Sequence, residues 1–225
     1  MKNKKKTFII SVGVIAFCVI MAFVDGVFRA DYFIKSLIKL VLFLGFPLLY
    51  AIFDKEFTVK EIFKINKKGV LVSLVLGVGV YAVILGGYSL LKGVFDFSNI
   101  TGTLTQNIGV KKENFLYVSL YISFINSFLE EFFFRGVAFL TLKRVAGRCF
   151  SYLFSAGAFA LYHVAMMIGW FSWELFLIVM LGLFLGGVIF NYLNEKTGSI
   201  YPSWLLHMFA NFAINTIGFI LFGII

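Results

Sequence analysis

Two adjacent glutamates and an arginine lie within an otherwise apolar stretch of this sequence. Glu130, Glu131 and Arg135 occur in the run Leu-Glu-Glu-Phe-Phe-Phe-Arg-Gly at 129–136. A helix would bring Glu131 and Arg135, four residues apart, onto one face as a pair. Glu130 would point about 100° away and could act as a general base toward water. The alternative is a structural ion pair that fixes helix packing.

Both histidines of the chain also lie in apolar stretches. His163 ends the run Phe-Ala-Leu-Tyr-His, and His207 opens the run His-Met-Phe-Ala-Asn, which ends at Asn211. A single histidine in such a stretch is often a hydrogen-bonded core residue. That neither histidine lies in a loop favours a functional role for the two. The spacing of four predicts that His207 and Asn211 share a helix face.

The composition indicates that these residues are inside a membrane. Hydrophobic residues make up 61% of the 225 residues and charged residues 14%, against roughly 25% charged in soluble domains. An ionisable group in the bilayer is costly, so it is a functional hypothesis by default. The net charge of +9 comes from basic residues in short loops, which favours a topological explanation over nucleic-acid binding.

Apolar segments of about 20 residues predict transmembrane helices. Seven are predicted, with an eighth if the last one breaks, and they cover 7–27, 34–53, 70–92, 115–141, 150–168, 173–193 and 200–225. Most lysines and arginines fall in alternate connections, which predicts a cytoplasmic N-terminus and an outside C-terminus. Lys35 and Lys39 are expected to snorkel from the start of the second segment. Counting residues from the helix ends puts Glu130, His163 and His207 in one zone between mid-depth and the cytoplasmic side.

Two further features concern packing and connections. Gly182 and Gly186 have the small-xxx-small spacing that permits close helix contact, and the pair Gly86-Gly87 is interpreted in the same way. The polar connection 92–113 is expected to be a mobile loop.

Together, the patterns E-E-x-x-x-R, F-x-x-x-H and H-x-x-x-N on successive helices resemble the CPBP group. This group comprises CAAX proteases and bacteriocin-processing enzymes and is also called the Abi family. The chain is similar to its type II CAAX prenyl endopeptidases. The resemblance spans about 116–215, and the segment 197–203 is similar to the family's approach to its third motif.

The resemblance implies a role for each residue. It implies that Glu130 and His163 activate a water, that His207 and Asn211 stabilise an oxyanion, and that Glu131 and Arg135 position the site. Metal dependence is left open: Glu130, His163 and His207 could bind zinc, but H-E-x-x-H is absent and a glutamate-activated water needs no metal.

The sequence thus predicts an all-α polytopic membrane bundle, one membrane domain over 1–225. Helices in 1–112 are accessory, and 113–225 forms the catalytic core. The predicted function is intramembrane proteolysis of a peptide or protein substrate at the plasma membrane, in bacteriocin maturation, self-immunity or CAAX-type processing. The partners are that substrate and the lipid bilayer, with no nucleic acid. The alternatives are a non-catalytic bacteriocin immunity protein and a cation-binding transporter.

Overall fold

The computed structural model describes residues 3–54 and 59–225, and all regular structure in these ranges is helical. The N-terminal half contains α1 (Lys4–Phe23), η1 (Val24–Phe28), α2 (Tyr32–Leu40), η2 (Val41–Gly45), α3 (Phe46–Phe53), α4 (Val59–Ile62), α5 (Lys67–Leu91) and α6 (Asn99–Ile108). The C-terminal half contains α7 (Phe115–Tyr121), η3 (Ile122–Asn126), α8 (Ser127–Glu130), η4 (Glu131–Thr141), α9 (Leu142–Ala146), α10 (Arg148–Tyr162), α11 (Val164–Met167), α12 (Trp173–Thr197) and α13 (Tyr201–Leu221). The η elements are wider π-helical stretches inside longer helical runs.

Within the described ranges, six helices are long and apolar enough to cross a membrane: Lys4–Phe28, Tyr32–Phe53, Lys67–Leu91, Arg148–Met167, Trp173–Thr197 and Tyr201–Leu221. The segment predicted at 115–141 is also helical, in a continuous run over 115–146, but its charged residues set it apart from these six. The last predicted segment forms one unbroken helix. The total of seven or eight spans therefore stays a prediction.

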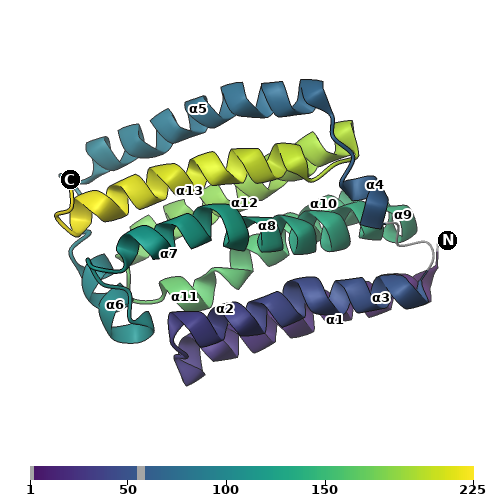
Figure 1. Ribbon diagram of the computed structural model, residues 1–225, viewed down its shortest axis with the longest axis horizontal. Coiled ribbons are helices and arrows are strands. Elements are labelled where there is room, and N and C mark those ends of the chain that lie inside the picture. Colours follow the sequence, from purple (N-terminus) through teal and green to yellow (C-terminus); the bar gives the residue numbers. More distant parts are fainter. Residues whose placement is uncertain (1–2, 55–58) are drawn as a thin grey trace.

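The helices lie side by side along one long direction (Figure 1). α1 begins at one end of the bundle and α13 ends at the other. α5 packs along α13, and α10 packs along α12. The hairpin formed by α1, α2 and α3 lies on the other side of the 115–146 run from α5 and contacts it through η2 and α1. The 115–146 run thus lies between α5 and the N-terminal hairpin.

Local sequence explains several helix boundaries. The Asp31 side chain caps α2 by accepting hydrogen bonds from the backbone N–H groups of Phe33 and Ile34 at 2.9 and 3.0 Å, a typical N-cap interaction. Gly147 separates α9 from α10 with a φ of 98°, and Gly198 ends α12 with a φ of 67°, conformations that favour glycine.

The glycines that permit close helix approach differ from those predicted. A Cβ added at Gly182, Gly186, Gly86 or Gly87 would meet no other atom within 4 Å, so the packing interpretation of these positions is wrong. A Cβ at Gly187 would instead lie 3.0 Å from the Ala156 backbone of α10. The spacing rule could not choose between neighbouring glycines because helix rotation decides which one faces a partner.

The connection predicted as a loop over 92–113 contains a helix. α6 spans Asn99–Ile108 and ends at Gly109, whose φ is 69°. The polar composition was therefore a poor guide to backbone structure here, because an amphipathic or polar helix at a bundle end needs no long apolar run.

Candidate active site

The two glutamates lie at a junction between helix types. Glu130 is the last residue of α8, and Glu131 is the first residue of η4. Another π-helical stretch, η3, precedes α8. Such wide turns change the rotation of a helix and occur frequently at functional sites. Both carboxylates are buried, with exposed fractions of 2% for Glu130 and 0% for Glu131.

The Glu130 carboxylate faces both histidines. Its Oε2 lies 3.9 Å from Nε2 of His163 and 3.8 Å from Nε2 of His207. Both separations exceed a direct hydrogen bond. The three residues come from α8, from the end of α10 and from α13, so the tertiary structure brings together the three side chains that the depth estimate put in one zone.

Hydrogen bonds fix the orientation of both imidazole rings. Nδ1 of His163 lies 2.7 Å from the Phe159 carbonyl oxygen, and Nδ1 of His207 lies 2.9 Å from Oε1 of Glu131. Both partners are acceptors, so each Nδ1 carries the hydrogen. In a neutral ring the Nε2 atom then presents a lone pair. The Nε2 atoms of both rings face the Glu130 carboxylate.

Glu131 joins His207 to Arg135. Besides its contact with His207, Oε1 of Glu131 lies 3.2 Å from an Arg135 guanidinium nitrogen, and neither side chain is exposed. The Arg135 guanidinium lies 4.1 Å from the ring centroid of Phe159 and 4.8 Å from that of Phe190. These cation–π contacts hold a buried planar cation. The Glu131–Arg135 pair predicted from helical spacing is therefore present.

Asn211 contacts the backbone of the glutamate-bearing run. Its Nδ2 donates to the Ile122 carbonyl oxygen at 3.1 Å. One turn further along α13, Nδ2 of Asn215 donates to the Ser119 carbonyl oxygen at 3.1 Å. These amides from α13 donate to one carbonyl group of α7 and to the first carbonyl group of η3, and so stabilise the irregular helix where it widens. His207 and Asn211 are both buried, but the described hydrogen bond of Asn211 is to Ile122.

Lys39, which was not among the predicted site residues, also lies at the site. Nζ of Lys39 lies 3.0 Å from Oε1 of Glu130 and also contacts the Asn126 side-chain oxygen. Nδ2 of Asn126 donates to the same Glu130 oxygen at 3.0 Å. The expectation that Lys35 and Lys39 snorkel is wrong, because both residues are only 4% exposed. The signal available in the sequence was a lysine within an apolar helix.

The suitability of the site for zinc depends on two opposing features. Two imidazoles whose Nδ1–H groups are engaged, together with a carboxylate, have the ligand chemistry of a catalytic zinc site. However, no group of three or more His, Cys, Asp or Glu side chains in the described parts of the chain is arranged to hold a metal ion. The Lys39 ammonium beside Glu130 also adds a positive charge that would oppose a dication. These residues, as arranged, do not fit a metal.

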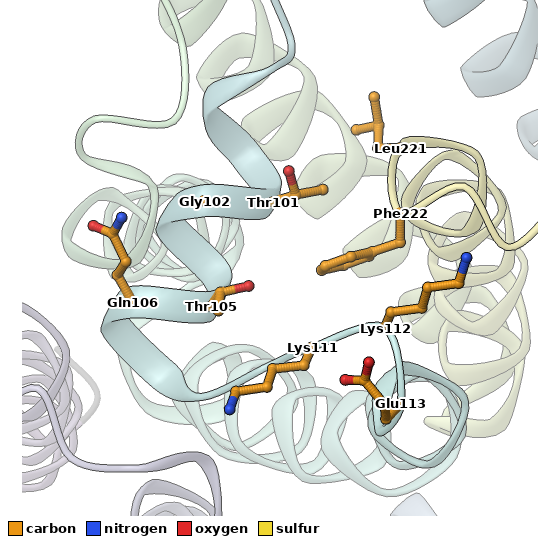
Figure 2. Close-up of a pocket in the computed structure, with 9 residues that line it drawn as sticks. All are labelled: Thr101, Gly102, Thr105, Gln106, Lys111, Lys112, Glu113, Leu221 and Phe222. Atoms are coloured by element: carbon orange, nitrogen blue, oxygen red, sulfur yellow. The ribbon is translucent and has the colours of Figure 1, made fainter.

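A hollow of about 510 Å³ lies elsewhere, at the bundle end where α13 terminates. Figure 2 shows the Phe222 ring directed into it. Its lining comes from α6, from the connection to α7 and from the end of α13: Thr101, Gly102, Thr105, Gln106, Lys111, Lys112, Glu113, Leu221 and Phe222. It shares no residue with the Glu130 cluster.

The fold and site define a class: an all-helical, multi-pass membrane protein with a buried cluster of glutamate, histidine and basic side chains. A family model described as Type II CAAX prenyl endopeptidase Rce1-like matches residues 112–213. The chain thus carries an Rce1-like domain, of a protease family, which confirms the resemblance found in the motifs. Comparisons with curated proteins and with solved structures gave no match. The matched region contains all six predicted site residues.

Proposed function

We propose that this protein is an intramembrane endopeptidase in which Glu130 and His163 activate a water. The observation that carries the proposal is that one Glu130 oxygen faces Nε2 of both His163 and His207, at 3.9 and 3.8 Å. Separations of this size between polar atoms suit a bridging water. A general base must lie within hydrogen-bond reach of the proton that it removes, directly or through one water.

In the proposed reaction, Glu130 accepts a proton from the water through Oε2. The water oxygen forms a bond to the carbonyl carbon of the scissile peptide, and the carbonyl oxygen becomes an oxyanion. Nε2 of His163 accepts the other hydrogen bond of the water and orients it. When the carbon–nitrogen bond breaks, Glu130 returns its proton to the leaving amine.

His207 and Asn211 are proposed to stabilise the oxyanion. Because Nδ1 of His207 already donates to Glu131, Nε2 can donate only if the ring is doubly protonated. A charged ring is compatible with the two carboxylates beside it, Glu131 at 2.9 Å and Glu130 at 3.8 Å. Asn211 uses one amide hydrogen for Ile122 and has a second to offer. Donors aimed at developing charge are often the largest catalytic contribution.

The proposed mechanism uses no metal. Lys39 supplies the positive charge next to Glu130, and the water can be polarised by the carboxylate and His163 alone. In biological terms we propose cleavage of a membrane-associated peptide or protein, in CAAX-type processing or in bacteriocin maturation or self-immunity. The immunity and transporter alternatives are not favoured by the family match.

The test compares membranes containing the wild type with membranes containing Glu130→Gln, which preserves shape and removes the base. Peptidomics of these membranes should reveal a cleavage product that is lost in the variant. In parallel, purified protein in proteoliposomes is given fluorogenic peptides ending in Cys-aliphatic-aliphatic-X, with and without a farnesyl group. Identical peptide profiles, with no test peptide cleaved by either protein, would reject the protease proposal, and equal cleavage by both proteins would reject Glu130 as the base.

A further inference from the structure

The N-terminal hairpin carries a buried lysine that contacts the proposed base. Lys39 lies in α2, outside the region that matches the protease family. Its ammonium is 3.0 Å from Oε1 of Glu130, and the two side chains are 5% and 3% exposed. The contact joins residues 91 positions apart in the sequence. The half of the chain predicted to be accessory therefore reaches the centre of the candidate site.

The two oxygens of Glu130 have different surroundings. Oε1 accepts from Lys39 and from Nδ2 of Asn126, each at 3.0 Å. Oε2 faces the two imidazoles. With Oε1 held on one side, rotation of the carboxylate is restricted and Oε2 is kept toward the histidines. A neighbouring cation also favours the ionised form of a carboxylate, which is the form that can remove a proton from water.

Aromatic residues hold the lysine in place. The Lys39 ammonium lies 5.0 Å from the ring centroid of Tyr162 and 5.9 Å from that of Phe43. Phe43 stacks on Phe133 of η4 with ring centroids 4.1 Å apart. The hairpin is therefore anchored to the same helical run that carries Glu130, so the position of the ammonium follows that of the carboxylate.

The two buried lysines of the hairpin have different partners. Lys35, one turn before Lys39, pairs with Asp25 at 2.6 Å, and those side chains are 5% and 3% exposed. Lys39 is therefore paired with a residue of the other half of the chain, whereas Lys35 is paired within the hairpin. A purely structural lysine could have been neutralised inside the hairpin, as Lys35 is.

We infer that Lys39 is a positioning residue for proteolysis, holding Glu130 ionised and oriented, so that the N-terminal hairpin completes the active site. The inference rests on the proposed function, since it assigns Lys39 a task in that reaction. Lys39 acts through Glu130 and does not touch the substrate.

The experiment compares Lys39→Gln, which retains a hydrogen-bond donor without charge, with Lys39→Arg, which retains the charge. The control is Asp25→Asn/Lys35→Met, which removes a buried lysine of the same helix without touching Glu130. Turnover of the farnesylated peptide should fall about tenfold or more in Lys39→Gln, because the Glu130 carboxylate loses the charged partner of Oε1 that keeps Oε2 toward the histidines, and misplacing a catalytic group by about 1 Å can cost about 100-fold in rate. Lys39→Arg should recover part of the rate, and the control should stay within about twofold of wild type.

A second readout needs no substrate. Infrared spectroscopy follows the carboxylic-acid band of Glu130, assigned by its loss in Glu130→Gln, as the pH is lowered. In Lys39→Gln the band should appear at a higher pH than in the wild type, and in Lys39→Arg and the control near the wild-type pH. The acid limb of the rate profile should move in the same direction.

The outcomes separate the two proposals. An unchanged infrared titration in a folded Lys39→Gln protein overturns the role of Lys39, whatever the substrate. Retained cleavage by Glu130→Gln overturns the proposed catalytic mechanism, while the titration still decides whether Lys39 controls Glu130. If Lys39→Gln does not fold, Lys39→Met, which removes the charge and keeps the apolar part of the side chain, gives the same comparison with Lys39→Arg. An unmoved titration in Lys39→Met, with activity unchanged, rejects the inference.

Discussion

At the scale of single residues, the site is built from paired buried charges and oriented rings. Lys39 pairs with Glu130, and Arg135 pairs with Glu131, which also accepts from His207. Unpaired burial of any of these ions would cost several kcal/mol. Each buried ion is therefore stabilised by its partner, and the stability lost in a substitution depends on whether an unpaired charge remains buried.

Replacing Arg135 alone should destabilise the fold more than replacing both Arg135 and Glu131. Arg135→Met leaves the Glu131 carboxylate buried without its cation, a change that typically costs about 3–5 kcal/mol. The double variant Glu131→Gln/Arg135→Met removes both charges and should recover part of that loss. Thermal unfolding in detergent measures the difference. A double variant less stable than Arg135→Met would contradict the pairing.

The metal-free mechanism also makes a prediction at this scale. Strong zinc chelators should leave turnover of the wild type unchanged, because Glu130, His163 and Lys39 supply the required groups. The purified protein should contain less than about one equivalent of zinc, against the full occupancy of a structural or catalytic zinc site. Loss of activity on chelation that added zinc restores would show a metalloprotease.

At the scale of elements, the irregular helical run over 115–146 orients the site. Its π-helical stretches flank Glu130, and amides of α13 bind its carbonyl groups. α12 packs against α10 where Gly187 meets Ala156, next to the rings that enclose Arg135. The close approach of α10 and α12 thus sets how far apart Phe159 and Phe190 lie on either side of the Arg135 guanidinium.

Substituting Gly187 by leucine should disturb the packing of α10 against α12 around Arg135. The added side chain meets the Ala156 backbone at 3.0 Å, and overpacking of this kind costs about 1–3 kcal/mol. Activity and thermal stability should both fall. Gly182→Leu is the matched control, since its Cβ meets nothing within 4 Å, and it should stay within about 0.5 kcal/mol of wild type. Equal losses in the two variants would show that helix approach at Gly187 does not matter.

At the scale of the whole molecule, α1 and α13 place their outer ends at opposite ends of the bundle (Figure 1). If both helices cross a membrane, the termini lie on opposite sides. The distribution of basic residues predicts that the N-terminus is cytoplasmic. This arrangement requires the charged run over 115–146 to cross the membrane as well.

Cysteine labelling tests that topology. In a background lacking Cys18 and Cys149, Ile225→Cys should react with a membrane-impermeant maleimide in intact cells, whereas Lys196→Cys should react only after permeabilisation. Labelling of both positions from the same side would contradict the predicted passage of α13 across the membrane. The rate assay on the same variants checks that the cysteine substitutions leave the site intact.

Several features could be predicted from the sequence because they depend on local periodicity. The long apolar segments predicted helices, and the spacing of four predicted the Glu131–Arg135 pair, since both follow from 3.6 residues per turn. The ordered motifs predicted the family. These inferences needed no knowledge of how the helices pack.

The contacts that join different helices could not be predicted in this way. Spacing placed His207 and Asn211 on one helix face, but it could not show that His207 contacts Glu131, 76 positions away. Lys39 was expected to reach toward the interface and instead contacts Glu130. The sequence by itself determined that these polar groups lie in apolar helices. The tertiary structure decided their partners, because a buried charge is stabilised by whichever opposite charge the packing of helices brings to it.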